Sequence, residues 1–339
     1  MNKILTVAIP AYNMEKYLHK CLDSLIIDDI SLLEEVEVIV INDGSKDSTS
    51  KIAHEYQNKY PKIFRVIDKE NGNYGSCLNR AFKEAHGLYF KTLDADDWFD
   101  KENFQKYIAV LKKNTNLDAI FTPFSYNYVD GRPKNIRTFT GAHFNEITQI
   151  NINDFVQNNW PYGIHSLTVK SDILKEHVEQ QTGISYTDIE YCLYSAPYLK
   201  KVMYVDVDLY QYSLGRDGQT VAFSSYLKNI SNIVLILRRW KDNVEKKNII
   251  IDDKQMYIIK LLFPVFYKIS LCYMKRNTEE YAFFRDFDKW LLLVSPTLSS
   301  FINSLTIKGF HYVKIWRCLK VDYTKYPLRF LFDYYKSKI

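Results

Sequence analysis

Leu93-Asp94-Ala95-Asp96-Asp97-Trp98 is the stretch around which the chain is organised, and it directly follows the apolar run 88–92. Three carboxylates within four positions repel one another, so such a stretch is stable only where a cation neutralises it or water solvates it. The apolar run before it is typical of a buried strand. We therefore interpret the stretch as the metal-binding end of a strand.

Three further strands are predicted before this one, at residues 4–9, 36–41 and 63–67, and each is followed by a helix. This alternation predicts an α/β fold with a mostly parallel, doubly wound sheet and right-handed crossovers. In such sheets ligands bind outside the carboxyl ends of the strands. Polar groups follow all four strands, at Tyr12-Asn13, Asp43-Gly44, 71–75 and 94–97. Their coincidence predicts a nucleotide-sized ligand at that edge.

The second half of the chain changes character. Up to residue 222 we expect further α/β elements, including a helix over 188–196 and a strand pair formed by 203–205 and 209–212. From about residue 224 glycine nearly disappears and long amphipathic periods predict helices. We place a domain boundary there, which gives a larger α/β domain over 1–222 and a smaller, mainly α-helical domain over 223–339.

Charge is unevenly distributed along the chain. Between Thr306 and Ile339 there are eight basic and two acidic residues, whereas the net charge of the whole chain is only +5. Such a basic C-terminal region is compatible with peripheral contact to an anionic membrane surface, although a region of this kind is more often a solvated helix face. We expect no nucleic-acid partner.

The sequence features that report on cellular location favour the cytoplasm. Five cysteines without a CxxC pair predict buried thiols in a reducing compartment. The opening apolar run ends at Pro10, which argues against a secretory signal. Residues 256–274 are apolar but contain Lys260, Pro264 and Lys268, so we do not expect a clean membrane span. The expected location is the cytoplasm, with the inner face of the cell membrane as the second alternative.

Three ordered segments make the resemblance to a known family specific. Val7-Ala8-Ile9-Pro10-Ala11-Tyr12-Asn13, then Val40-Ile41-Asn42-Asp43-Gly44-Ser45-Lys46-Asp47-Ser48-Thr49, then Leu93-Asp94-Ala95-Asp96-Asp97 resemble the signatures of the family-two, GT-A type glycosyltransferases of bacterial surface-polysaccharide assembly. The resemblance covers about residues 1–222. It implies a Rossmann-like GT-A domain that binds a nucleotide-sugar together with Mn²⁺ or Mg²⁺.

The resemblance also implies roles for individual residues. Pro10, Tyr12 and Asp43 match positions that hold the nucleotide base and ribose, and Asp94 matches a position that binds a ribose or sugar hydroxyl. Asp96 matches the principal metal ligand, with Asp97 beside it as a supporting residue or a helix cap. The other expected nucleotide-sugar contacts are Asn13, Asn71, Gly75, Asn79, Ala95, Arg216, Gln219 and Thr220.

Two segments depart from the family pattern. The usual arginine directly before the asparagine is absent, because the order here is Leu78-Asn79-Arg80. In the segment expected to supply the catalytic base, Thr187 replaces the first acid and Asp188 matches the base. Each candidate residue here also has a non-catalytic interpretation. Asp188 would then simply be an acid favoured by the helix dipole at a helix N-terminus, Glu190 a solvated residue of the first turn, and His165 a structural histidine.

Together these features predict an inverting, metal-dependent glycosyltransferase that uses a nucleotide-diphosphate sugar, with a UDP-sugar favoured. The acceptor is expected to be a hydroxyl of a saccharide or lipid-linked saccharide, and a homo-oligomer is left open. Two rival interpretations stay open: a non-catalytic saccharide- or nucleotide-binding module, and another phosphate-handling enzyme such as a nucleotidyltransferase or an Asp-x-Asp phosphatase.

Overall fold

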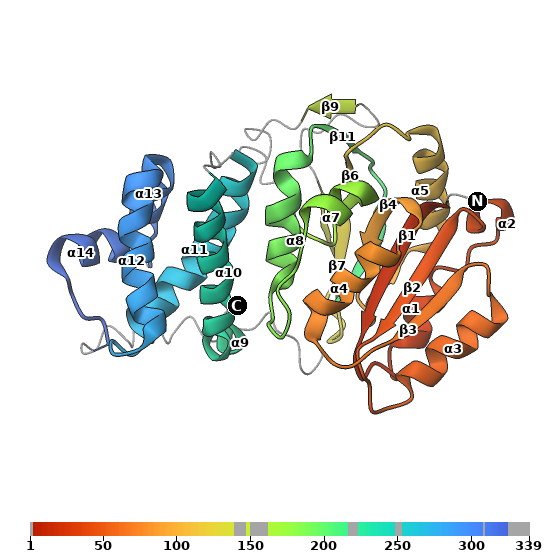
Figure 1. The fold of residues 1–339 in the computed structure, drawn as a ribbon, viewed down its shortest axis with the longest axis horizontal. Helices are drawn as coiled ribbons and strands as arrows, with labels where there is room; N and C mark the ends of the chain where they lie inside the picture. The colour runs from red at the N-terminus through yellow and green to blue at the C-terminus, as the bar shows by residue number, and fades with distance from the viewer. Residues whose placement is uncertain are drawn as a thin grey trace. The chain divides into compact units, whose positions relative to one another are not determined.

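The computed structural model describes residues 3–138, 147–149, 162–215, 223–247, 253–307 and 309–324. The chain divides into two compact units, Met1–Asp217 and Gly218–Ile339. Figure 1 shows the elements of each unit along the chain. We describe each unit by itself, and the roles expected for the two predicted domains stay predictions.

The main sheet of the first unit has the predicted, mostly parallel architecture. Within the described residues its strand order is β3-β2-β1-β4-β10-β6-β11-β9, and β1 to β4 are mutually parallel neighbours. The strand β10 runs antiparallel to both β4 and β6. The strands are β1 (Lys3–Ala11), β2 (Val36–Asn42), β3 (Phe64–Asp68), β4 (Gly87–Thr92), β6 (Ala119–Phe121), β9 (Ile147–Gln149), β10 (Leu167–Lys170) and β11 (Lys201–Tyr204).

Helices cover both faces of this sheet, which explains why β1 and β2 are buried along almost their whole length. On one face α4, α7 and α8 contact one another (Figure 1), and on the other the core includes side chains of α1, α3 and α5. The helices of this unit are α1 (Leu18–Asp23), α2 (Ile30–Leu33), α3 (Thr49–Lys59), α4 (Asn73–Glu84), α5 (Lys101–Lys113), α7 (Ser171–His177) and α8 (Thr187–Ser195), with a 3₁₀ turn, η1 (Ala196–Tyr198).

A second, smaller sheet lies in the same unit, and its strands are ordered β5-β12-β7-β8. They are β5 (Trp98–Phe99), β7 (Phe124–Tyr128), β8 (Asn135–Arg137) and β12 (Tyr210–Leu214). The predicted pairing of 203–205 with 209–212 is wrong, because β11 belongs to the main sheet and β12 to the small one. Each strand instead pairs in parallel with a partner distant in sequence, β6 and β7 respectively.

The second unit is helical, as the sequence predicts. Its described helices are α9 (Phe223–Lys228), α10 (Ile230–Lys247), α11 (Asp253–Cys272), α12 (Glu279–Val294), α13 (Pro296–Ser304) and α14 (Tyr312–Leu319). By length and composition, residues Gln255–Cys272 of α11 would suffice to cross a membrane, yet 61% of that window is buried within the structure. All five cysteines are free thiols; four are buried as predicted, but Cys318 is exposed.

Candidate active site

The carboxyl ends of β1, β2, β3 and β4 lie at one edge of the main sheet, because these strands are parallel and in register. The turns that follow them are bound to one another. The backbone N–H of Asn13 donates to Ser45 Oγ at 3.0 Å, and Asn13 Oδ1 accepts from the backbone N–H of Lys46 at 2.8 Å. The predicted gathering of polar groups at this edge is therefore present.

The residues expected to hold the nucleotide differ in their exposure and in the hydrogen bonds that they already make within the protein. Pro10 lies buried within β1, whereas Tyr12 is 45% exposed directly after that strand and so has ring surface available for stacking. Asp43 is buried and accepts hydrogen bonds from Lys69 Nζ at 2.5 Å and from the Gly72 backbone N–H at 3.0 Å. Asn71 donates to the Asp43 carbonyl at 2.9 Å. Their contacts to a nucleotide stay predictions.

Two other predicted contact residues hold the protein's own backbone. Asn79 donates from Nδ2 to the Gln180 carbonyl at 2.9 Å and accepts at Oδ1 from the Gln180 N–H at 2.8 Å. A Cβ on Gly75 would lie 2.2 Å from the carbonyl oxygen of Gln181, so only glycine fits there. Asn79 and Gly75 thus fasten helix α4 to the segment 180–183, and their contact with a nucleotide-sugar stays a prediction. Arg80 instead pairs with Glu84 at the surface at 2.9 Å.

The acidic stretch is held in place by tyrosines. Asp94 Oδ1 accepts from the Tyr74 hydroxyl at 2.8 Å, while the Asp94 backbone N–H donates to the Tyr210 hydroxyl oxygen at 3.1 Å. Asp97 is buried and accepts from the Tyr210 hydroxyl and from the Ser213 N–H, both at 2.7 Å. Burial and the charges of Asp96 and Asp94 raise the pKa of Asp97.

The two alternatives for Asp97 can now be separated. Asp100, and not Asp97, caps α5, because the Asp100 side chain accepts from the backbone N–H of Asn103 at 3.0 Å. Asp97 instead binds Tyr210 and the backbone of β12. Ala95, between the first two acids, is buried.

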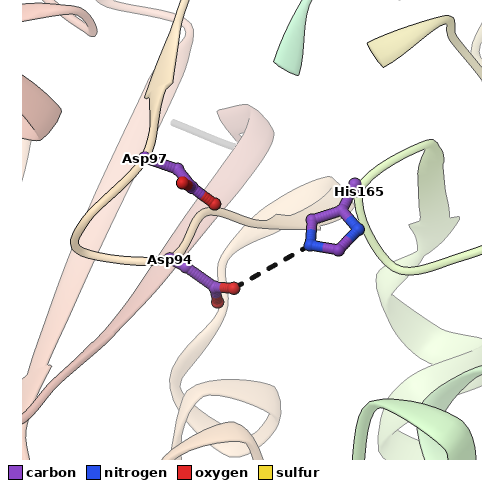
Figure 2. A group of neighbouring side chains, drawn as sticks. All are labelled: Asp94, Asp97 and His165. Atoms are coloured by element: carbon purple, nitrogen blue, oxygen red, sulfur yellow. Dashed lines mark ion pairs between the residues drawn. The ribbon is translucent and has the colours of Figure 1, made fainter. Parts of the chain in front are cut away.

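A histidine joins the acidic stretch, as Figure 2 shows. The Nε2 atom of His165 lies 4.0 Å from Asp94 Oδ2, and potential ligand atoms of Asp94, Asp97 and His165 all lie within 4.8 Å of one another. Burial, with a smaller effect of the Lys91 ammonium, lowers the pKa of His165 to about 3, so its imidazole is neutral at physiological pH. Carboxylate oxygens suit Mn²⁺ and Mg²⁺, and a neutral imidazole is a common additional metal ligand.

The metal prediction fits this donor set, although the three-residue group does not include Asp96. Asp97 accepts two hydrogen bonds, from Tyr210 and Ser213, and Asp94 accepts one from Tyr74. Asp96 as principal ligand stays a prediction. No local motif marks His165 as a possible ligand, because only the fold brings it beside Asp94.

Asp188 lies in the first turn of α8, exposed to solvent, after Tyr186 with a left-handed backbone at φ +67°. Partial loss of hydration raises the pKa of Asp188 from its ordinary value of 3.8. Burial and the Asp94 charge raise the pKa of Tyr74, and the Asp188 charge adds to this effect, so Asp188 lies near the tyrosine that binds Asp94. The fold thus places Asp188 within electrostatic reach of Tyr74, and its role as the base stays a prediction.

The interpretation of Glu190 as a solvated first-turn residue is wrong. Glu190 is buried and accepts from both the backbone N–H and the Nε2 group of Gln181, each at 2.8 Å. The predicted late-loop contacts Arg216, Gln219 and Thr220 lie outside the described residues.

Comparison with known proteins adds independent information to this geometry. The model for "Glycosyl transferase family 2" matches residues 6–178, just over half of the chain. The chain belongs to this glycosyltransferase family. The family membership and the GT-A fold predicted from the three signatures are thereby confirmed.

Relatives of this family-2 chain extend the comparison. The chain is 36% identical over 126 residues to an uncharacterised glycosyltransferase, MG025, of Mycoplasma genitalium. The match covers 37% of this chain and 42% of that protein. The chain therefore spans less than half the length of this curated relative.

Two solved glycosyltransferase structures share the fold. Residues 1–349 of S. aureus TarS, solved in complex with UDP-GlcNAc, superimpose with a TM-score of 0.65 at 18% identity, covering 98% of this chain and 91% of that one. The mannosyltransferase PcManGT from Pyrobaculum calidifontis, in complex with GDP-Man and Mn²⁺, gives a TM-score of 0.51 at 13% identity, covering 88% and 78%.

Proposed function

We propose that this chain is an inverting, metal-dependent glycosyltransferase that moves a sugar from a nucleotide-diphosphate sugar to a hydroxyl group of a saccharide acceptor. One observation carries the proposal. The Tyr74 hydroxyl donates to Asp94, and the Asp188 charge contributes to raising the pKa of Tyr74, which supports one shared site for the predicted donor residue and the predicted base. Family membership makes glycosyl transfer the expected reaction at that site.

The donor would occupy the strand-end edge. Tyr12 would stack on the base and Asp43 would accept a base N–H, while Asp94 would bind a ribose or sugar hydroxyl. UDP is the favoured nucleotide, since TarS with the same fold was solved with UDP-GlcNAc. PcManGT, however, was solved with GDP-Man, so donors with other nucleotides should also be tested.

Asp96 would hold Mn²⁺ or Mg²⁺, and Asp94 and the neutral His165 imidazole, whose potential ligand atoms lie within 4.8 Å of each other, would be further donors. A bound divalent cation stabilises the negative charge that develops on a departing diphosphate. Asp188 would take the proton of the acceptor hydroxyl as its oxygen attacks the anomeric carbon from the face opposite the diphosphate. The predicted loop residues Arg216, Gln219 and Thr220 would add phosphate contacts.

The setting proposed from the family resemblance is bacterial surface-polysaccharide assembly at the cytoplasmic side of the membrane. Three further parts of the proposal rest on this resemblance and on charge. They are a lipid-linked acceptor, a membrane role for the region 223–339 and a homo-oligomer.

The test is release of nucleoside diphosphate from a panel of nucleotide-sugars, with Mn²⁺ or with EDTA. We expect metal-dependent release from at least one donor, and loss of that release in Asp96→Ala. Asp172→Ala is the matched control, because Asp172 is an exposed first-turn acid of the neighbouring helix α7. If no common nucleotide-sugar is turned over in the presence of metal, the chain is a binding module and the enzyme proposal fails.

A further inference from the structure

We propose that an aromatic stripe on β7 and β12 is the platform that binds the acceptor saccharide. The stripe consists of Phe124, Tyr126 and Tyr128 on β7 and of Tyr210 and Tyr212 on β12. The inference rests on the proposed function and assigns a place and a chemical class to the acceptor. Three independent features of the small sheet carry it.

The first feature is register. The two strands run parallel, and Tyr210 lies opposite Phe124 and Tyr212 opposite Tyr126. Because side chains alternate between the two faces of a strand, all five rings point to the same face of the sheet. Neighbouring rings are in contact: the Tyr126 centroid lies 5.4 Å from Phe124 and 5.8 Å from Tyr212.

The second feature is continuity with the candidate active site. The inner end of the stripe is Tyr210, whose hydroxyl donates to Asp97 at 2.7 Å. The His165 ring, beside Asp94, lies 4.9 Å from Tyr210 and 4.6 Å from Tyr212 between centroids. A molecule lying on Tyr212 would therefore reach the acidic stretch, where transfer is proposed.

The third feature is a change in burial along the stripe. Phe124 and Tyr210 are buried, whereas Tyr126, Tyr128 and Tyr212 are only partly buried. The Arg132 guanidinium lies 4.2 Å from the Tyr128 ring centroid at the outer end. The rings thus run from the core beside Asp97 toward the surface.

The opposite face of the same strands is already engaged. The Ser125 hydroxyl donates to the carboxylate of Asp208 at 2.7 Å, and Asn127 Nδ2 donates to Gln211 Oε1 at 3.3 Å. The polar face therefore binds the protein itself, and the aromatic face is the one that has accessible ring surface.

The chemistry of the stripe selects a saccharide. A pyranose ring has a face of C–H groups that packs on an aromatic ring and a rim of hydroxyls that needs polar partners, and tyrosine supplies both. A nucleotide base also stacks on rings, but the base is assigned to Tyr12 at the end of β1. Along the stripe an acceptor of more than one sugar unit would rest on successive rings.

The experiment uses the full chain and saturation-transfer NMR with methyl glycosides of glucose, galactose and N-acetylglucosamine, and with sorbitol as an acyclic polyol. We expect transfer to the ring C–H protons of at least one glycoside and little to sorbitol. Tyr126→Leu should weaken that binding roughly two- to tenfold, whereas Tyr126→Phe should retain most of it. Asn127→Ala, on the opposite face of the same strand, is the matched control and should bind as the wild type does.

Thermal stabilisation by UDP and Mn²⁺, measured on the same variants, separates this inference from the proposed function. Unchanged stabilisation in Tyr126→Leu, with weakened glycoside binding, supports the stripe as an acceptor site. Equal binding by the Leu and Phe variants, or no glycoside signal above sorbitol, overturns it. If glycosides bind but no nucleotide-sugar is turned over, the proposed function fails while the saccharide platform stands.

Discussion

Asp188 is the residue whose local environment bears most directly on the proposed mechanism. Its carboxylate opens α8 and lies near Tyr74, and its pKa is raised above the ordinary 3.8 by partial loss of hydration. A base must be deprotonated to accept the acceptor proton, so activity should fall as the pH drops through this raised pKa. We expect the acidic limb of the kcat profile to lie above the pH at which an ordinary aspartate titrates.

The variant Asp188→Asn tests this directly. Loss of a general base is expected to lower kcat by roughly 10²- to 10⁴-fold and to abolish the acidic limb. Donor affinity, measured by thermal stabilisation with UDP and Mn²⁺, should stay near that of the wild type. An Asn variant with the wild-type acidic limb would assign the proton transfer to another group.

Single residues show where sequence reasoning succeeds and where it ends. The carboxylates from Asp94 to Asp97 and the base candidate Asp188 belong to local motifs, which can be recognised without the fold. The partners that orient them cannot, because the bond between the Asp94 N–H and Tyr210 spans 116 positions. Tyr74, Tyr210 and His165 were not among the predicted site residues for this reason.

At the scale of elements, α4 and α8 are joined through the segment 180–183. Asn79 of α4 binds both backbone groups of Gln180, and Glu190 of α8 binds the N–H and the side chain of Gln181. The Gly183 N–H donates to the Gly72 carbonyl at 3.0 Å at the N-terminal end of α4. The segment thereby sets the position of α8, and with it Asp188, relative to α4 and the turn that precedes it.

The variant Asn79→Ala removes two of these hydrogen bonds. At about 1 kcal/mol each, we expect a loss of roughly 2 kcal/mol in the free energy of unfolding, together with a lower kcat. Arg80→Ala is the control one position away, since its side chain is 50% exposed and pairs only with Glu84 among the described contacts. Thermal or urea unfolding measures the stability of both variants. Equal melting temperatures would contradict a stabilising role for the Asn79–Gln180 hydrogen bonds.

Elements were predicted best where a pattern is local. The first four strands follow from apolar runs that end in polar turns. The pairing of β11 and β12 was predicted wrongly, because two strands close in sequence usually form a hairpin, whereas here each joins a distant parallel neighbour. Choosing between these outcomes depends on tertiary contacts that no short segment contains.

At the scale of the whole molecule, the second unit is stabilised by a buried polar network of its own. Arg317 and Asp288 form an ion pair at 2.5 Å with side chains only 10% and 5% exposed, and the Tyr267 hydroxyl donates to Asp288 at 2.8 Å. This network joins α11, α12 and α14. Arg317 is one of the eight basic residues counted toward a membrane-facing C-terminal region, and the structure uses its charge internally.

Removing one partner of a buried ion pair leaves the other charge buried and unpaired, which costs about 3–5 kcal/mol. We therefore expect Asp288→Asn to destabilise the second unit, because Arg317 then lacks its carboxylate. Hydrogen exchange followed by mass spectrometry should show faster exchange in α11 to α14 and unchanged exchange in β1 to β4. Asp286→Asn, two positions away with a 76% exposed side chain, should exchange as the wild type does. Faster exchange throughout both units would instead mean that the two unfold as one cooperative body.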